Sequence, residues 1–148
     1  MKKTLIITGL LLSAFGGKAQ EACNNKTIMH QIDSLKNVFK RSGFTVMQEA
    51  SVSMESENEL PVMVPMKMGI PYQVVFIGDA QSQSFEVKMY DFREKQVFHS
   101  RTNTKEGKTN IITYSYIPQM SEYHLISTSQ TNSKKNKNLC GYILLLKK

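Results

Sequence analysis

Residues 72–90 decide the fold of this chain: YQVVFI at 72–77 is followed by the loop GDAQSQ at 78–83 and by FEVKMY at 85–90. The first segment is nearly all apolar, as expected of a strand that is covered on both faces. The second alternates apolar with charged or polar residues, which predicts a strand with one buried face. No helical pattern separates them, so the sequence favours antiparallel over parallel strands.

The same two-residue period continues on both sides of this stretch, from Gly43 to the end of the chain. It predicts strands at residues 44–54, 60–68, 72–77, 85–90, 96–101, 112–116, 123–130 and 139–146. Pro61 and Pro65 cannot donate hydrogen bonds to a neighbouring strand, so the second strand is expected at a sheet edge. The turn at 91–95 predicts a hairpin between the fourth and fifth strands. Together these features predict a mainly β chain, folded as an antiparallel jelly-roll-like β-sandwich.

One amphipathic helix is predicted before the strands, at residues 26–42. Its apolar residues recur at steps of four, three and four, at Ile28, Ile32, Leu35 and Phe39, with Met29 and Val38 widening the stripe. The side chains available to cap its start are those of Asn24, Asn25 and Thr27. Gly43 supplies the left-handed residue at which helices commonly stop.

The first twenty residues have the layout of a secretory signal peptide. Lys2 and Lys3 precede a short apolar run, and small residues around Ala19 and Gln20 offer a cleavage site. We therefore expect residues 1–20 to be removed and residues 21–148 to form a single secreted or periplasmic domain. No stable membrane span is expected after cleavage, because the apolar run is too short to cross a bilayer.

The basic character of the chain is modest and local. Three of its 19 basic residues are removed with the signal peptide. The remaining 16 basic and 12 acidic residues lower the formal charge from +7 to +4. Much of the excess lies at Lys134, Lys135, Lys137, Lys147 and Lys148. We interpret these lysines as a solubilising loop and tail, and no nucleic-acid partner is expected.

The two cysteines, Cys23 and Cys140, lie at opposite ends of the mature chain. In an oxidising compartment a single disulfide between them is the natural pairing, and two buried free thiols are the alternative.

Three segments carry a resemblance to a known family. They are GIPYQVVF at 69–76, FEVKMYD at 85–91 and SEYHL at 121–125. Over residues 69–146 the chain resembles the jelly-roll sandwich of bacterial pre-peptidase C-terminal domains. It is also similar to bacterial C-terminal sorting domains, although Glu122 stands where that pattern has glycine. The resemblance implies a sandwich fold and a non-catalytic role.

No residue pattern predicts catalysis or a cofactor. The histidines His30, His99 and His124 lack the spacing of metal ligands, and no serine lies in a nucleophile-elbow motif. Asp79 and Asp91 lie in loops at strand ends, where sandwiches can bind calcium, but aspartate in a turn commonly hydrogen-bonds its own backbone. The acidic residues Glu55, Glu57 and Glu59 are expected to form a solvated edge.

The two-residue period predicts which face of its strand each methionine and tyrosine side chain lies on. The first strand is expected to carry Phe44, Val46, Gln48, Ala50, Val52 and Met54 on one face, and the second Leu60, Val62, Val64, Met66 and Met68. This makes Met66 and Met68 core residues with Met63 pointing the other way, and a Cu(I) site is the alternative. Tyr72, Tyr90 and Tyr123 are expected in the core or covering the sheet, and Tyr114 and Tyr116 are expected on one face.

The sequence therefore predicts an exported, non-enzymatic binding or interaction module whose partner is an unknown protein or glycan at the cell envelope. The alternative is a small metal-dependent or hydrolase-like secreted protein whose site is assembled from distant residues.

Overall fold

The computed structural model describes residues 23–104 and 109–148, which form one helix and eight strands. The elements are α1 (Lys26–Arg41), β1 (Thr45–Met54), β2 (Leu60–Met66), β3 (Tyr72–Ile77), β4 (Ser84–Tyr90), β5 (Gln96–Asn103), β6 (Ile111–Tyr116), β7 (Glu122–Thr131) and β8 (Leu139–Lys147). The mainly β fold class is confirmed, and every predicted strand is present. The predicted signal peptide, residues 1–20, lies outside the described residues.

The strands form two four-stranded sheets, a first sheet in the order β1-β8-β3-β6 and a second in the order β2-β7-β4-β5. All neighbours are antiparallel, and β1 pairs with β8, β2 with β7, β3 with β6 and β4 with β5. This nesting of pairs is that of a jelly roll. The proline-containing strand β2 lies at a sheet edge and β4–β5 is a hairpin, as predicted.

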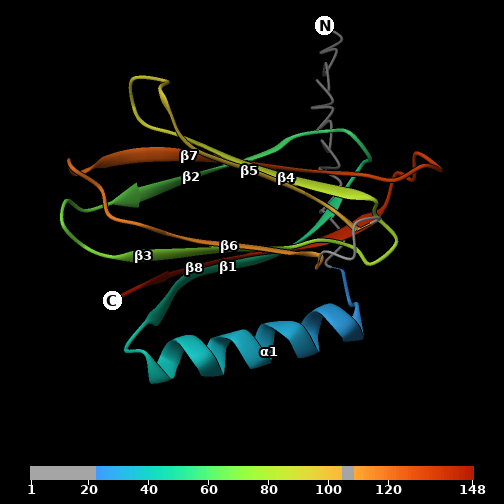
Figure 1. Cartoon of the computed structure of the whole chain (residues 1–148), viewed down its shortest axis with the longest axis horizontal. Coiled ribbons are helices and arrows are strands. Elements are labelled where there is room, and N and C mark those ends of the chain that lie inside the picture. The colour runs from blue at the N-terminus through green and yellow to red at the C-terminus, as the bar shows by residue number, and fades with distance from the viewer. Residues whose placement is uncertain (1–22, 105–108) are drawn as a thin grey trace, which may run out of the picture.

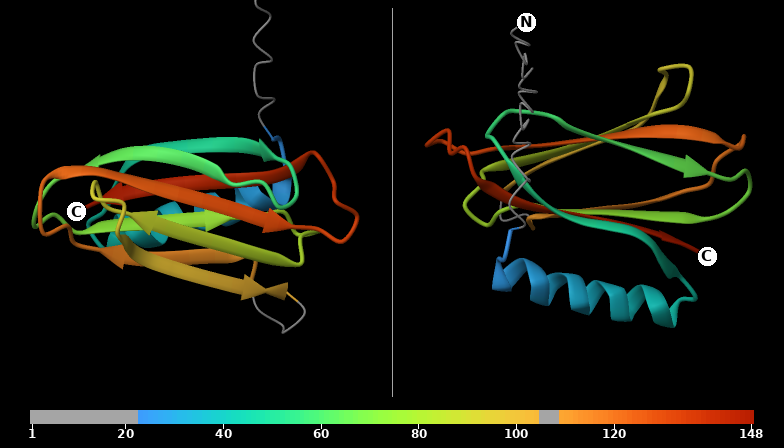
Figure 2. Two further views of the ribbon diagram at one scale, coloured as in Figure 1. Left: turned by 90° about the horizontal axis from the view of Figure 1, so that it is seen from above. Right: turned by 180° about the vertical axis from the view of Figure 1, so that it is seen from behind.

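The molecule has three layers: α1, the first sheet and the second sheet (Figure 1). Strands β3 and β8 are buried on both faces because α1 lies on one side of the first sheet and the second sheet on the other. The views from above and from behind show α1 against the first sheet, and no helix of residues 23–104 and 109–148 lies on the outer side of the second sheet (Figure 2).

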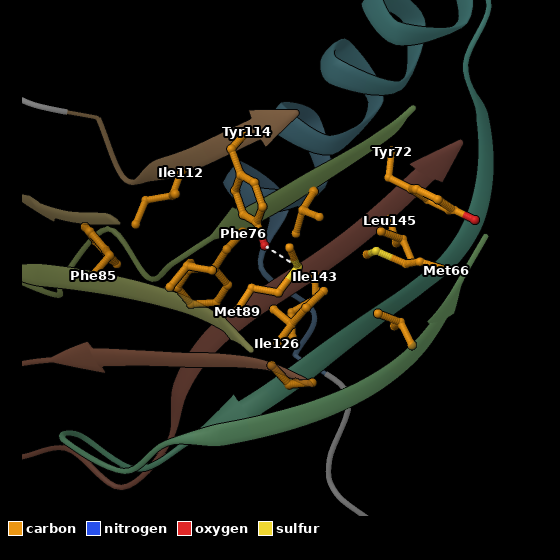
Figure 3. Close-up of a cluster of buried hydrophobic side chains, with 14 of the residues drawn as sticks. Met66, Tyr72, Phe76, Phe85, Met89, Ile112, Tyr114, Ile126, Ile143 and Leu145 are labelled. Carbon is orange, nitrogen blue, oxygen red and sulfur yellow. Dashed lines mark hydrogen bonds between the residues drawn. The ribbon is translucent and has the colours of Figure 1, made fainter. Parts of the chain in front are cut away.

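The main core lies between the two sheets. Figure 3 shows Phe76 and Ile143 of the first sheet meeting Met89 and Ile126 of the second. The Tyr114 hydroxyl donates to the Met89 sulfur at 3.4 Å, so this buried phenol has a hydrogen-bond partner. A second core joins α1 to the first sheet through Ile28, Ile32, Val75, Ile77, Tyr142, Leu144 and Leu146.

Helix α1 begins and ends as its sequence predicts. Asn25 is the N-cap, and its side-chain oxygen accepts from the N–H groups of Thr27 and Ile28. At the other end Gly43 is left-handed, and Phe44 donates its N–H to the Phe39 carbonyl while the two rings pack edge-on. The predicted width of the apolar stripe is wrong, however, since Met29 and Val38 are exposed.

The predicted face of β1 is wrong in its first half because of a β-bulge. The pairing with β8 shifts between Val46 and Gln48, so Met47 is an extra residue. Phe44 therefore packs with the helix-side core and Val46 is exposed, while Met47 packs against the main core in place of Gln48. A bulge reverses side-chain parity without any change in residue type, so the alternation alone could not locate it.

The predicted disulfide between Cys23 and Cys140 is present, with 5.4 Å between the two Cα atoms. It ties the segment before α1 to the beginning of strand β8, across a sequence separation of 117 residues. Ser51 of β1 reinforces this attachment by donating its hydroxyl to the Cys23 carbonyl at 2.9 Å.

Loss of this disulfide is expected to destabilise the fold through the unfolded state. In the double variant Cys23→Ser, Cys140→Ser the unfolded chain regains the entropy of an open loop, which lowers the free energy of unfolding by about 4 kcal/mol. Urea denaturation of the oxidised protein and the variant measures the difference. A change below about 1 kcal/mol would show that the crosslink does not restrain the unfolded chain.

A polar clamp also joins the helix to the first sheet. The Glu49 carboxylate of β1 is paired with Lys36 of α1 and accepts from the Tyr142 hydroxyl at 2.5 Å. These two hydrogen bonds, that of Lys36 first, hold the pKa of Glu49 below its ordinary value of 4.5. The carboxylate is partly exposed, so solvent screens the clamp and its contribution is modest.

Because the Glu49 pKa is lower in the folded state, this stabilisation is complete above about pH 4.5 and is lost as the pH falls through the folded-state value. Glu49→Gln is expected to lower stability by less than about 1 kcal/mol at pH 7 and to match the parent protein at low pH. Thermal unfolding from pH 7 to pH 3 tests this, with the exposed-loop variant Glu57→Gln as the control. An equal loss in Glu49→Gln at every pH would contradict it.

Candidate functional site

One end of the sandwich is closed by buried polar side chains. The Gln130 side-chain oxygen accepts from the N–H of Asp79 and from the hydroxyl of Ser82, both at 2.9 Å, and its nitrogen donates to the Cys140 carbonyl at 3.1 Å. Gly78 is required beside this network, because a Cβ there would lie 2.1 Å from the Phe85 ring. This closed end serves the fold.

The two aspartates predicted as possible metal ligands both bond the backbone. Asp79 accepts from the N–H of Gln81 at 2.9 Å and from that of Cys140 at 3.0 Å. Asp91 accepts from the N–H groups of Arg93 and Lys95 in the β4–β5 turn, both at 2.9 Å. In the part of the chain that the structure describes, no three or more His, Cys, Asp or Glu side chains gather as a metal would need.

The three histidines are in unrelated surroundings. His30 is exposed on α1, and His99 of β5 bonds Glu86 at 2.8 Å. His124 is fully buried between the sheets, with its Nε2 atom 3.2 Å from the Tyr116 hydroxyl. Its Nδ1 atom has no hydrogen-bond partner, alone among the buried side-chain nitrogens and oxygens of the described residues.

The outer face of the second sheet carries the most distinctive arrangement of side chains. The register of β2, β7, β4 and β5 places its outward residues in rows across the strands. Two rows are mainly apolar or aromatic, Pro65–Tyr123 and Met63–Leu125–Tyr90–Gln96; three are mainly polar, Pro61–Ser127–Lys88–His99, Ser129–Glu86–Arg101 and Thr131–Ser84–Asn103. The face therefore divides into an aromatic half and a polar half.

The polar half is held by a network of charged hydrogen bonds. Lys88 contacts Glu59 at 2.8 Å and Glu86 at 3.5 Å, and Ser127 donates to Glu59 at 2.8 Å. The Lys88 bond, followed by that of Ser127, lowers the pKa of Glu59. Burial would raise the pKa of Glu86, but the His99 hydrogen bond and the Lys88 charge outweigh it and lower that pKa as well. Both carboxylates are thus held ionised in fixed positions.

The aromatic half is open to solvent. A cleft of about 480 Å³ is lined there by Met63, Tyr90, Asp91, Phe92, Glu94, Tyr123 and Leu125. The exposed fractions are 73% for Phe92, 61% for Met63 and 54% for Tyr123. Soluble domains rarely expose contiguous apolar side chains, and such a group is typical of a binding surface.

Two predictions of burial are wrong at this end of the molecule. Tyr123 is expected in the core or covering the sheet, but it is 54% exposed on the outer face of the second sheet, near the start of the inner strand β7. Met68 was expected to continue the face of Met66, which is buried, but β2 ends at Met66 and leaves Met68 exposed in the following turn. The outward position of Met63 is confirmed. Phe92 and Leu125 were not singled out from the sequence.

No protein-family model and no curated protein sequence matches the chain. Among solved structures, one concerned with CBM4 structure and function is 14% identical, with a TM-score of 0.46, and the match covers 76% of this chain and 83% of that one. Dimeric latent PorU from Porphyromonas gingivalis is 12% identical, with a TM-score of 0.36 and coverages of 64% and 10%. A chain of infectious bursal disease virus, Gx strain, is 10% identical, with a TM-score of 0.26 and coverages of 67% and 31%.

These likenesses are too distant to bear on function. Among the described residues no helix is long and apolar enough to cross a membrane.

The role of Asp79 can be separated from metal binding. Asp79→Ala leaves the N–H groups of Gln81 and Cys140 without their acceptor, so we expect a loss of about 2 kcal/mol in the free energy of unfolding. Millimolar calcium should leave the melting temperature of the parent protein unchanged, because the Asp79 oxygens already accept from the backbone. A melting temperature that rises with calcium in the parent and not in Asp79→Ala would contradict this role.

Proposed function

We propose that this protein is an exported, non-enzymatic binding module whose ligand lies on the outer face of the second sheet. The observation that carries the proposal is the difference between the two sheets. Helix α1 covers the outer face of the first sheet, whereas the corresponding face of the second exposes an aromatic half beside a pre-organised polar half. A disulfide suits an oxidising compartment, which supports export.

We further propose that the ligand is a glycan. A sugar ring presents an apolar C–H face that stacks on aromatic rings, and hydroxyl groups at its edge that need fixed hydrogen-bond donors and acceptors. Tyr90 and Tyr123 supply the aromatic rings for stacking. The network of Glu59, Glu86 and Lys88 supplies hydrogen-bonding groups for the hydroxyls on the same face. The core of a protein–protein interface is instead depleted in charged residues.

The size of the face favours an oligosaccharide over a single sugar. From Tyr123 to Ser129 the outward side chains follow β7 over seven residues, and the six steps between them span about 20 Å along the strand. An extended glycan can therefore contact both the aromatic and the polar half.

The electrostatics support binding without hydrolysis. Most glycoside hydrolases use two carboxyl groups of different character, one of which stays protonated to act as a general acid. The pKa values of Glu59 and Glu86 are both lowered, so both are ionised at neutral pH and neither can serve as that acid.

Replacement of the aromatic side chains tests the proposal. Tyr90→Ala and Tyr123→Ala are each expected to weaken binding about tenfold, because loss of one stacked ring costs about 1.4 kcal/mol. The probes are soluble xylan, mixed-linkage β-glucan and isolated peptidoglycan, measured by affinity electrophoresis and pull-down. Val38→Ala on the exposed side of α1 is the matched control.

Retention of a glycan by the parent and the control, with loss in both tyrosine variants, supports the proposal. If the parent retains none of the three probes, or if the tyrosine variants bind as well as the control, the glycan assignment is overturned. Binding of a protein in place of the glycans, lost in the same tyrosine variants, would overturn the ligand class while keeping the face.

A further inference from the structure

The end of the sandwich opposite the closed one is open between the edge strands β1 and β2. A cleft of about 530 Å³ lies there, within the range of about 300–1,000 Å³ found for ligand sites. Met66 and Tyr72, both fully buried, form its floor, and Met47 and Ile70 contribute to its walls. Figure 3 shows Met66 and Tyr72 beside Leu145 at this end of the core, so the floor of the cleft belongs to the main core.

The apolar floor is rimmed by cationic side chains. Lys67, Lys147 and Lys148 line the cleft, against the single carboxylate of Glu122. These four side chains carry a formal charge of +2, from three ammonium groups and one carboxylate. Lys148 also lies over the Phe44 ring, with its Nζ atom 5.9 Å from the ring centroid.

The position of Lys147 is unusual for a lysine. Along β8 the side chains of Ile143 and Leu145 point into the main core, and Lys147 continues their parity. Its register partner on β3 is Tyr72, which belongs to the same core. The β1 bulge directs Met47 to the same side. A cation therefore stands where the next core side chain would be expected.

We propose that this cleft binds an amphiphile with one anionic headgroup, such as a long-chain carboxylate. The alkyl chain lies on Met47, Met66, Ile70 and Tyr72, and the carboxylate is bound by the ammonium groups at the rim. Burial of the chain supplies the affinity, and the charge-assisted hydrogen bonds select an acid over a neutral lipid. The cleft lies at the end of the proposed glycan face and shares Pro65 and Tyr123 with it, but neither Tyr90 nor the polar network lines it.

Displacement of a fluorescent fatty-acid probe tests the proposal. Dodecanoate, below its micelle concentration, is expected to displace the probe at least tenfold more effectively than dodecanol or acetate. The double variant Lys67→Gln, Lys147→Gln should lose about tenfold in dodecanoate affinity and keep its affinity for dodecanol. Lys134→Gln, Lys135→Gln, in the β7–β8 loop, is the matched control for net charge, and Met47→Trp should block both ligands by filling the cleft.

Circular dichroism and thermal unfolding establish that each variant is folded, and Met47→Phe replaces Met47→Trp if the larger side chain prevents folding. Equal affinity for dodecanoate and dodecanol, equal losses in the two lysine pairs, or binding only to vesicles or micelles would overturn the proposal. Tyr90→Ala should still bind dodecanoate, so failure of this proposal and failure of glycan binding are distinguishable.

Discussion

The structure depends on the burial of β3 and β8 on both faces. Two adjacent strands whose side chains are apolar on either side cannot lie at a protein surface, so a layer is needed on each side of the first sheet. The second sheet supplies one layer and α1 the other, and Asn25, Gly43 and the disulfide hold α1 in place. Because α1 is the only helix of the described residues and packs on the first sheet, the outer face of the second sheet is exposed to solvent.

That asymmetry accounts for where binding chemistry is available. A sheet face in water normally carries polar side chains, and the half containing Lys88 and Glu86 does so. The half containing Met63, Tyr90 and Tyr123 does not, although exposed apolar area contributes nothing to the stability of the isolated domain. The two ends of the sandwich differ in a similar way: Gln130 and Asp79 close one, and lysines surround an open apolar cleft at the other.

Much of the fold was predictable because its signals are local. The helix stripe, its asparagine and glycine caps, the edge position of β2 and the β4–β5 hairpin each follow from residues close together in the chain. The errors lack a local signal: the exposure of Met29 and Val38 on the helix, the bulge beside Met47, the end of β2 before Met68, and the exposure of Tyr123 near the start of β7. The site was less predictable, because Leu125, Tyr90 and Met63 become neighbours only through strand register.

The amino-acid sequence alone determined the pleated architecture and the helix that precedes it, since periodicity and residue chemistry specify these without knowledge of neighbours. It offered Cys23 and Cys140 as a pair, and the tertiary structure decided between a disulfide and two free thiols by bringing their Cα atoms to 5.4 Å. Only the tertiary structure decided which sheet the helix covers and which side chains share a row or a cleft. Those relations depend on strand order and register, which bring together residues from distant parts of the chain.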